Sequence, residues 1–290
     1  MSPLHPASGE GEIGIVLSKA CAALKAAGIE SPRMEARILL AHASKTSVED
    51  IIAERIVPAP DTLARFEVAL SRRIAREPIA YITGRREFWS LNFIVDKNVL
   101  IPRPETELLV EEALRRFPDS AAPLTVLDLG TGSGCILLAF LSERTNATGI
   151  GVDASPGAAA IAVCNAQALK LDARARFSVQ DWSEVSGTYD LVFSNPPYID
   201  TAGIASLAPD VAAYEPMEAL DGGKDGLDAY RSLALVLSKV MKSGGRAFIE
   251  LGLGQADAAT RIFQGQGLVI DALVNDLAQI PRCLVLFRQT

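Results

Sequence analysis

Histidine is scarce in this sequence, and its cysteines are not arranged in pairs. The 290 residues contain only two histidines, and the four cysteines never form a Cys-x-x-Cys pair. His5 falls in an N-terminal tail, and His42 lies in an apolar helical pattern that favours a packed surface residue over a catalyst. These shortages disfavour catalysis by histidine, a disulfide framework and a cysteine-ligated metal site. We therefore expect chemistry that needs neither a histidine base nor a metal.

Basic charge and long apolar runs are lacking as well. The chain has 28 Lys and Arg against 35 Asp and Glu, a net charge of -7. This balance disfavours a protein that gains its affinity from many phosphate contacts, so we expect no direct nucleic-acid partner. No apolar run approaches the roughly 18 residues of a membrane span, and the N-terminus has no basic region followed by an apolar one. We expect a cytoplasmic protein without a signal peptide or a membrane partner.

The first part of the chain carries helical signals and no strand signals. In IGIVLSKACAALKAAGI, apolar residues recur at three- and four-residue spacing, and Gly28 follows as a helix stop. The segments SPRMEARILLAHAS and DTLARFEVALSRRIAREP begin with Ser31 and Asp61, which are residue types common at helix starts. We expect three or four helices that form a separate unit. After Pro78, AYITGRREFWSLNFIV is rich in aromatic and β-branched residues, which predicts a hairpin or two short strands.

From Leu124 onward, short apolar runs alternate with helical segments. The runs are LTVLDLG, ATGIGVD, ARFSVQD, YDLVFSN and GRAFIELG, and helical stretches such as CILLAFLSER and LDAYRSLALVLSKVM separate them. This rhythm predicts βαβ units in a mostly parallel sheet with helices on both faces. Ligands bind such sheets at the carboxyl ends of the strands. Four runs end in a polar residue that we expect on this rim: Asp128, Asp153, Asp181 and Asn195.

The segment VLDLGTGSGCILL predicts a strand, a glycine loop and a helix. Its glycines allow a sharp turn and a close approach of a ligand, and the helix start offers free N–H groups. The Gly-x-Gly-x-Gly spacing differs from the Gly-x-Gly-x-x-Gly of dinucleotide sites, and no Gly-Lys-Ser/Thr of a P-loop follows. Asp128 stands two residues before the first glycine, which suits an amino-bearing ligand better than a pyrophosphate. S-adenosylmethionine carries such an amino group together with a ribose and an adenine.

Beyond the glycine loop, three further residues would complete a nucleoside pocket: Asp153, Asp181 and Trp182. Asp153 follows Gly134 by 19 residues and is placed to accept two hydrogen bonds from a ribose diol. Asp181 can accept a hydrogen bond from an adenine amino group, and Trp182 can cover the face of the ring.

The tetrapeptide Asn195-Pro196-Pro197-Tyr198 ends a buried strand with residue types that can hold a planar amino group. An amide or aromatic amine is a poor nucleophile because its lone pair is delocalised, so two acceptors that grip both N–H bonds would orient the nitrogen. Asn195 offers a side-chain carbonyl and Pro196 a backbone carbonyl on a stiff chain. Tyr198 offers a face for stacking. The pattern predicts methylation of a planar amino group without a strong base.

Several segments together resemble one known family. The chain is identified as a member of the release factor glutamine methyltransferase family (HemK or PrmC). The segments that carry this resemblance are REFWSLNFIVDKNVLIPRPETE, VLDLGTGSGCI, GVDAS, QDW, SNPPYI and YEPMEALDGGKDGLDAYR. The motif Asn-Pro-Pro-Tyr alone is shared with methyltransferases of adenine and cytosine amino groups, whereas PRPETE with REFWSL ahead of it is much narrower.

The resemblance implies a class I methyltransferase fold with a small added domain. This fold is α/β and Rossmann-like, with a seven-stranded, mostly parallel sheet and helices on both faces, and RCLVLFR would supply its antiparallel last strand. A small all-helical N-terminal domain would be joined to it by a β-hairpin. We expect a helical domain at residues 1–80 that docks release factors, a hairpin linker at 81–103 and the methyltransferase domain at 104–290.

The resemblance also implies a reaction and a set of contacts. The reaction is methyl transfer from S-adenosyl-L-methionine to the side-chain amide nitrogen, N5, of the glutamine in the Gly-Gly-Gln motif of peptide chain release factors. These factors would be the partners of a monomeric enzyme. Catalysis would fall to Asn195, Pro196 and Tyr198, and substrate binding to these three with Pro197. The cofactor would contact Gly130, Thr131, Gly132, Ser133, Gly134, Asp153, Asp181, Trp182 and Asn195.

Two alternatives stay open on the residues alone. The first is an amino-group methyltransferase that acts on adenine in nucleic acid, which would share the tetrapeptide and the cofactor but should carry a basic reading surface. The second is a nucleotide-binding module or an oxidoreductase of the same fold. The sequence also leaves open the roles of five residues near the start of the second part. Arg103, Glu105 and Glu107 could shape the cofactor pocket or cap the helix that begins nearby, and Phe88 and Trp89 could line the pocket or pack in the core.

Overall fold

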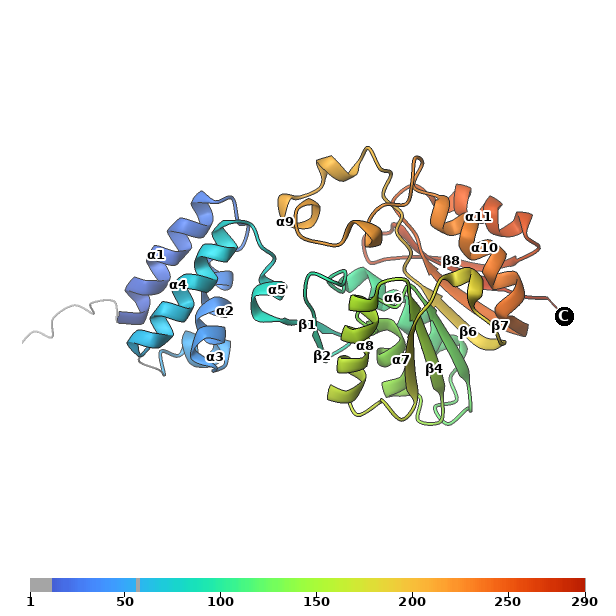
Figure 1. The fold of residues 1–290 in the computed structure, drawn as a ribbon, viewed down its shortest axis with the longest axis horizontal. Coiled ribbons are helices and arrows are strands. Elements are labelled where there is room, and N and C mark those ends of the chain that lie inside the picture. The colour runs from blue at the N-terminus through green and yellow to red at the C-terminus, as the bar shows by residue number, and fades with distance from the viewer. Residues whose placement is uncertain (1–11, 56–57, 290) are drawn as a thin grey trace, which may run out of the picture. The chain divides into compact units, whose positions relative to one another are not determined.

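The computed structural model describes residues 12–55 and 58–289, which form two compact units, one through Thr83 and one from Gly84 (Figure 1). His5 lies outside the described residues. The described part of the N-terminal unit is helical, as expected. Its helices are α1 (Glu12–Ala26), α2 (Pro32–Ser44), α3 (Val48–Ile52), α4 (Pro60–Ile74) and α5 (Ile79–Thr83).

The helical unit has its own apolar core. Leu24 of α1, Leu39 and Leu40 of α2 and Phe66 of α4 are buried in one cluster. In α1, Leu24 lies on the face that the three- and four-residue spacing predicts, whereas Ile15, which shares that spacing, is exposed. Burial of apolar side chains from several helices is therefore the main source of stability of this unit.

Helix α5 corrects one expectation. Residues 79–83 have a strand-like composition but form a turn of helix, in which the N–H groups of Tyr81 and Ile82 donate to the carbonyl of Pro78. Ala80, Tyr81 and Ile82 are buried, so packing of this face outweighs the β preference of the residues. The predicted hairpin begins after Gly84. Strand β1 (Arg85–Phe88) pairs antiparallel with β2 (Leu91–Ile94).

The second unit is built on a seven-stranded sheet, which confirms the predicted fold class. Its strand order is β5-β4-β3-β6-β7-β9-β8, and β9 runs antiparallel to both β7 and β8. Strand β8 and helix α11 are missing from the sequence prediction. The strands are β3 (Thr125–Leu129), β4 (Thr148–Asp153), β5 (Ala175–Val179), β6 (Tyr189–Ser194), β7 (Met241–Glu250), β8 (Val269–Asn275) and β9 (Pro281–Phe287).

Helices cover both faces of this sheet (Figure 1). Helices α6 (Glu107–Arg116), α7 (Cys135–Glu143) and α8 (Pro156–Ala168) contribute to one core, and α10 (Asp228–Val240) and α11 (Ala256–Gly265) to the other. Alternation along the strands feeds both cores: Phe248 of β7 enters the first and Ile249 the second. The remaining short elements are α9 (Pro209–Ala212) and the 3-10 helices η1 (Pro104–Thr106), η2 (Trp182–Glu184), η3 (Ile204–Ser206) and η4 (Met217–Ala219).

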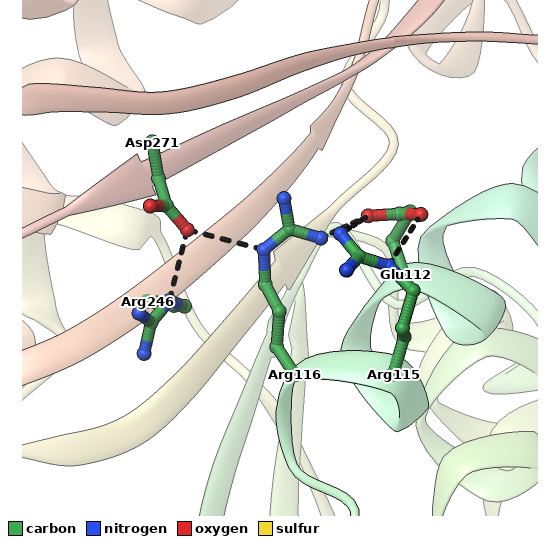
Figure 2. Close-up of polar contacts among 5 residues, drawn as sticks. All are labelled: Glu112, Arg115, Arg116, Arg246 and Asp271. Carbon is green, nitrogen blue, oxygen red and sulfur yellow. Dashed lines mark hydrogen bonds and ion pairs between the residues drawn. The ribbon is translucent and has the colours of Figure 1, made fainter.

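A charged network ties α6 to the edge strand β8 (Figure 2). Arg116 lies between Glu112 of its own helix and Asp271 of β8, and both Arg116 and Glu112 have side chains only 10% exposed. Arg246 of β7 donates to the same Asp271 oxygen at 3.0 Å. Burial alone would raise the pKa of Glu112, but hydrogen bonds from Arg115 and Arg116 outweigh it and lower that pKa. The network therefore holds α6, β7 and β8 together through ionised groups.

Candidate active site

A pocket of about 810 Å³ lies at the carboxyl ends of the central strands. Its lining includes Asp153 at the end of β4, the loop after β3 and Asn195 directly after β6. Strands β4 and β6 lie on opposite sides of β3, so the pocket stands at the point where the strand order reverses. Open parallel sheets bind their ligands at this point.

Most of the predicted site residues meet in this pocket, and some do not. The lining contains Gly130, Thr131, Gly132, Ser133, Asp153, Trp182, Asn195 and Pro197. Four predicted residues are absent from it: Gly134, Asp181, Pro196 and Tyr198. The structure therefore brings together the glycine loop, the acid of β4 and the first residue of the tetrapeptide.

The glycine loop presents open backbone to the pocket at one position and packs at another. Gly132 has a φ of 53° and nothing within 4 Å of where a Cβ would stand, so a ligand can approach its backbone closely. Gly134 has a φ of 78°, and a Cβ there would come within 3.1 Å of Phe177 Cζ. Gly132 thus leaves room for a ligand, and Gly134 lets the loop pack on the sheet and helix behind it.

Asp153 is held in place by backbone donors on both of its oxygens. Gly132 N–H donates to Oδ2 at 2.9 Å, and Ser155 N–H donates to Oδ1 at 2.9 Å. A carboxylate has about four lone-pair sites, so each oxygen keeps capacity for a further hydrogen bond. The arrangement fits a ligand with two adjacent hydroxyl groups.

Asp181 stands outside the pocket, whereas Trp182 lines it. Asp181 is exposed and accepts hydrogen bonds from the backbone N–H and the hydroxyl of Ser183, which lower its pKa. It caps the short helix η2 in this way. The Trp182 ring packs over the loop, because a Cβ on Gly130 would come within 3.2 Å of Trp182 Cζ2. Trp182 can therefore cover a flat ligand, whereas the predicted role of Asp181 would require its side chain to turn.

Asp128 anchors the loop from beneath. It is fully buried, and the hydroxyl of Thr131 donates to its Oδ2 at 2.7 Å. Burial raises the pKa of Asp128 to about 7; the bond from Thr131 opposes this rise, and the nearby charge of Asp153 adds to it. Asp128 is not part of the pocket lining, so it supports the loop rather than facing a ligand.

The tetrapeptide is tied to two residues that the sequence analysis missed. Asn195 Nδ2 donates to Thr106 Oγ1 at 3.2 Å, and Thr106 Oγ1 donates to Glu250 Oε2 at 2.6 Å. Tyr198 O–H donates to the other oxygen of Glu250 at 3.2 Å. A signal for Glu250 was available, since it is a polar residue at the end of the apolar run GRAFIELG, like the acids at the other strand ends.

A glycine-rich segment supports the tetrapeptide from behind. Ile199 forms a parallel bridge with Asp221, and Gln255 Nε2 donates to the Tyr198 carbonyl at 2.8 Å. A Cβ on Gly222 would stand 2.8 Å from Tyr198 Cα, and one on Gly226 would stand 2.5 Å from Tyr198 O. The segment 221–226 must therefore remain free of side chains at these two positions.

Of the residues whose roles were left open, Arg103 alone lines the pocket. It forms an ion pair with the buried Glu215, whose second oxygen accepts from Ile101 N–H at 3.1 Å. The other four lie elsewhere. Glu107 and Trp89 are joined, because Glu107 Oε1 accepts from the Trp89 backbone N–H at 2.7 Å. The Trp89 ring nitrogen Nε1 donates to Glu143 Oε1 at 2.9 Å. Phe88 is buried in the core, and Glu105 is exposed.

The fold and the pocket define a methyltransferase of the Rossmann-like class. Residues 121–263 match the family described as methyltransferase domain, and residues 16–84 match the PrmC N-terminal domain. A methyltransferase structure from Pyrococcus furiosus has the same fold, with a TM-score of 0.53 and 17% identity over 76% of this chain and 98% of that one.

Two full-length relatives specify the family. The release factor glutamine methyltransferase of Rhodospirillum rubrum is 42% identical over 279 residues, which cover 96% of this chain and 85% of the relative. That of Agrobacterium fabrum is 37% identical over 285 residues, 97% of this chain and 99% of the relative. The chain belongs to the release factor glutamine methyltransferase family. Among the residues that the structure describes, no helix is both long and apolar enough to cross a membrane.

Proposed function

We propose that this protein transfers a methyl group from S-adenosyl-L-methionine to N5 of the glutamine in the Gly-Gly-Gln motif of peptide chain release factors. The observation that carries the proposal is the meeting of Gly132, Asp153 and Asn195 in one pocket of a chain from this family. A nucleoside site and an amide-binding residue therefore share one cavity. We also propose that the reaction takes place in the cytoplasm and that the enzyme acts as a monomer.

The pocket has groups suited to each part of the methyl donor. Asp153 would accept the ribose hydroxyls, the open backbone at Gly132 would lie against the donor, and Trp182 would cover the adenine. When bound, S-adenosyl-L-methionine would supply an electrophilic methyl group on a sulfonium. Transfer would form one C–N bond and break one C–S bond, so that a neutral thioether leaves and the amide nitrogen gives up one proton to solvent. The protein's own contribution is to bind and orient the two reactants.

The tetrapeptide would orient the substrate amide. The Nδ2 group of Asn195 is engaged by Thr106, which leaves Oδ1 to accept one of the amide N–H bonds. The sequence suggests the backbone carbonyl of Pro196 as the second acceptor; because Pro196 does not line the pocket, this contact would require its carbonyl to become accessible when the substrate binds. Two fixed acceptors hold the nitrogen in the direction of attack, and positioning of this kind lowers the barrier without a strong base.

The two units would divide the work. We propose that residues 1–80 dock the release factor, that 81–103 form the linking hairpin and that 104–290 carry the reaction. Removal of residues 1–80 should weaken methylation of an intact release factor far more than binding of the methyl donor. Unchanged activity on the intact factor, with the shortened protein shown to be folded, would refute the docking role.

Mass spectrometry of a purified release factor after incubation with enzyme and methyl donor tests the reaction itself. We expect one added methyl group on the glutamine of the Gly-Gly-Gln tripeptide and none on a factor whose glutamine is replaced by alanine. A parallel assay with DNA and labelled methyl donor separates this reaction from methylation of adenine. Label in DNA with none in the factor would favour the adenine reaction.

A further inference from the structure

Two buried side chains outside the predicted site, Thr106 and Glu250, are linked to Asn195 by hydrogen bonds. Glu250 and Thr106 are each 2% exposed, and they are joined by a hydrogen bond of 2.6 Å. They lie 144 residues apart in the sequence, at the end of β7 and at the end of η1. A buried carboxyl group is costly unless it is hydrogen-bonded. Their contacts therefore call for an explanation.

The direction of each hydrogen bond follows from the chemistry of the acceptor. Burial raises the pKa of Glu250 to about 7, so above this pH the carboxyl group is ionised. An ionised carboxylate can only accept, so the single proton of the Thr106 hydroxyl must then point toward Glu250. The lone pairs of Thr106 Oγ1 are then left to accept, and Asn195 Nδ2 lies 3.2 Å away as the donor. The amide of Asn195 is thereby fixed with its nitrogen toward Thr106 and its oxygen turned away.

The same carboxylate also holds the other end of the tetrapeptide. Tyr198 O–H donates to Glu250 Oε1, and the Glu250 backbone carbonyl accepts from Tyr230 O–H at 3.2 Å. Both oxygens of Glu250 thus accept from hydroxyl groups, one on each of two segments that meet at the pocket. Glu250 is consequently tied to both Asn195, through Thr106, and Tyr198.

We propose that Glu250 and Thr106 are positioning residues, which keep the side-chain oxygen of Asn195 available to accept an N–H of the substrate amide. This inference rests on the proposed function and deepens it. If the hydroxyl of Thr106 turned toward Asn195 instead, the Asn195 amide would have to reverse and present its NH₂ group to the substrate. The NH₂ group of Asn195 would then face the N–H bonds of the substrate glutamine amide. Both are hydrogen-bond donors, so the hydrogen bond that orients the substrate could not form.

The test compares two variants at position 106 and a control elsewhere with the unaltered enzyme. Thr106→Val keeps the shape and removes the hydroxyl, and Thr106→Ser restores the hydroxyl. Thr125→Val is the control elsewhere. It removes a similar hydrogen bond from a threonine hydroxyl to a carboxylate, Thr125 Oγ1 to Asp190 Oδ2 at 2.7 Å, which lies at the amino ends of the strands. Turnover and KM for a release factor, donor binding by calorimetry and the thermal midpoint are measured for each.

We expect Thr106→Val to lower kcat by about 10- to 100-fold, the range seen when a partner that orients a metal-binding side chain is removed. Donor binding should change little, and Thr106→Ser should recover most of kcat. Thr125→Val should lower stability without lowering kcat. A folded Thr106→Val with normal kcat would overturn the inference, as would a loss that Thr106→Ser does not recover.

Glu250→Gln provides a second, independent variant. Its amide can donate to Thr106 and allow the hydroxyl to turn toward Asn195, so we expect a loss of kcat at least as large as that of Thr106→Val. Normal kcat in folded Glu250→Gln would also count against the inference. If the unaltered enzyme did not methylate release factors at all, the proposed function and the inference that rests on it would both fail. Activity of the unaltered enzyme together with normal kcat in the folded variants would overturn the inference alone.

Discussion

The backbone N–H of Gly132 donates a hydrogen bond of 2.9 Å to Asp153 Oδ2, which ties the glycine loop to the end of the neighbouring strand β4. Asp153 thus has two tasks, to hold the loop and to face the pocket. Because the loop contributes Thr131 and Ser133 to the same lining, its position and the ligand contact are coupled.

Asp153→Asn should weaken binding of the methyl donor by about 10- to 100-fold, since hydrogen bonds to a charged group contribute roughly 1.5–3 kcal/mol. Calorimetry with S-adenosyl-L-methionine measures the change. Asp119→Asn is the matched control, because Asp119 Oδ1 also accepts a backbone N–H at 2.9 Å, from Ala121, but Asp119 is exposed and does not line the pocket. Equal affinity in Asp153→Asn and the control would refute a ribose contact.

Asn195→Ala should remove the acceptor for the substrate amide. We expect kcat for a release factor to fall by at least about 100-fold, the loss associated with one preorganised polar contact. The donor should still bind, because Gly132, Asp153 and Trp182 keep their places in the lining. Single-turnover kinetics together with calorimetry separate the two effects. Near-normal turnover would contradict the grip by the tetrapeptide.

Gly222→Ala should displace the tetrapeptide without filling the pocket. Its Cβ would stand 2.8 Å from Tyr198 Cα and 2.9 Å from the Pro197 carbonyl oxygen, both backbone atoms, so the chain has to move. We expect a lower kcat with nearly unchanged donor affinity. Gly265→Ala is the control, because its Cβ would meet nothing within 4 Å. Equal turnover in the two variants would mean that the loop position is not critical.

Much of the fold could be predicted because its signals are local. The strands that carry the site are short apolar runs with a polar residue at or next to their carboxyl ends, Asp128, Asp153 and Asn195, and these ends meet as a parallel sheet requires. Strand β8 was not predicted from the sequence because each of its residues is at least partly exposed, so it has no buried apolar run. Helix α5 was misjudged because burial of its apolar side chains, which only the folded unit determines, outweighed their β preference.

The site was less predictable than the fold because its second layer is assembled from distant segments. Thr106 reads as one residue of a proline-rich turn, and only the structure places it between Asn195 and Glu250. The same holds for Arg103, whose partner Glu215 lies 112 residues away. Asp181 shows the converse, since its place at a strand end suggested a ligand contact, whereas its side chain caps η2.

Asp128 should make stability depend on pH. Its pKa is raised to about 7 in the folded protein, first by burial, whereas a model Asp titrates near 3.8. The folded state therefore binds more protons than the unfolded state between these values, so stability is fully present below about 3.8 and is lost as pH rises through about 7. The loss attributable to this group is at most about 4 kcal/mol.

Denaturant unfolding of the protein and of Asp128→Asn at pH 5 and pH 8 measures this effect. Glu250, whose burial raises its pKa to about 7, contributes a slope of the same sign in both proteins, so the difference between them isolates Asp128. We expect the variant to lose less stability between the two pH values. An identical pH dependence in both proteins would show that Asp128 titrates normally.

Arg116→Met should test the charged network of Figure 2. The change leaves Glu112 buried without its closest cation, and removal of one partner of a buried ion pair costs about 3–5 kcal/mol of unfolding free energy. Arg115→Met is a close control, because Arg115 pairs with the same Glu112 at 3.0 Å but has a side chain 62% exposed. Exposed pairs contribute about 0–1 kcal/mol. Urea unfolding should therefore give a large loss for Arg116→Met and a small one for Arg115→Met, and similar losses in the two variants would mean that burial does not decide the strength of this network.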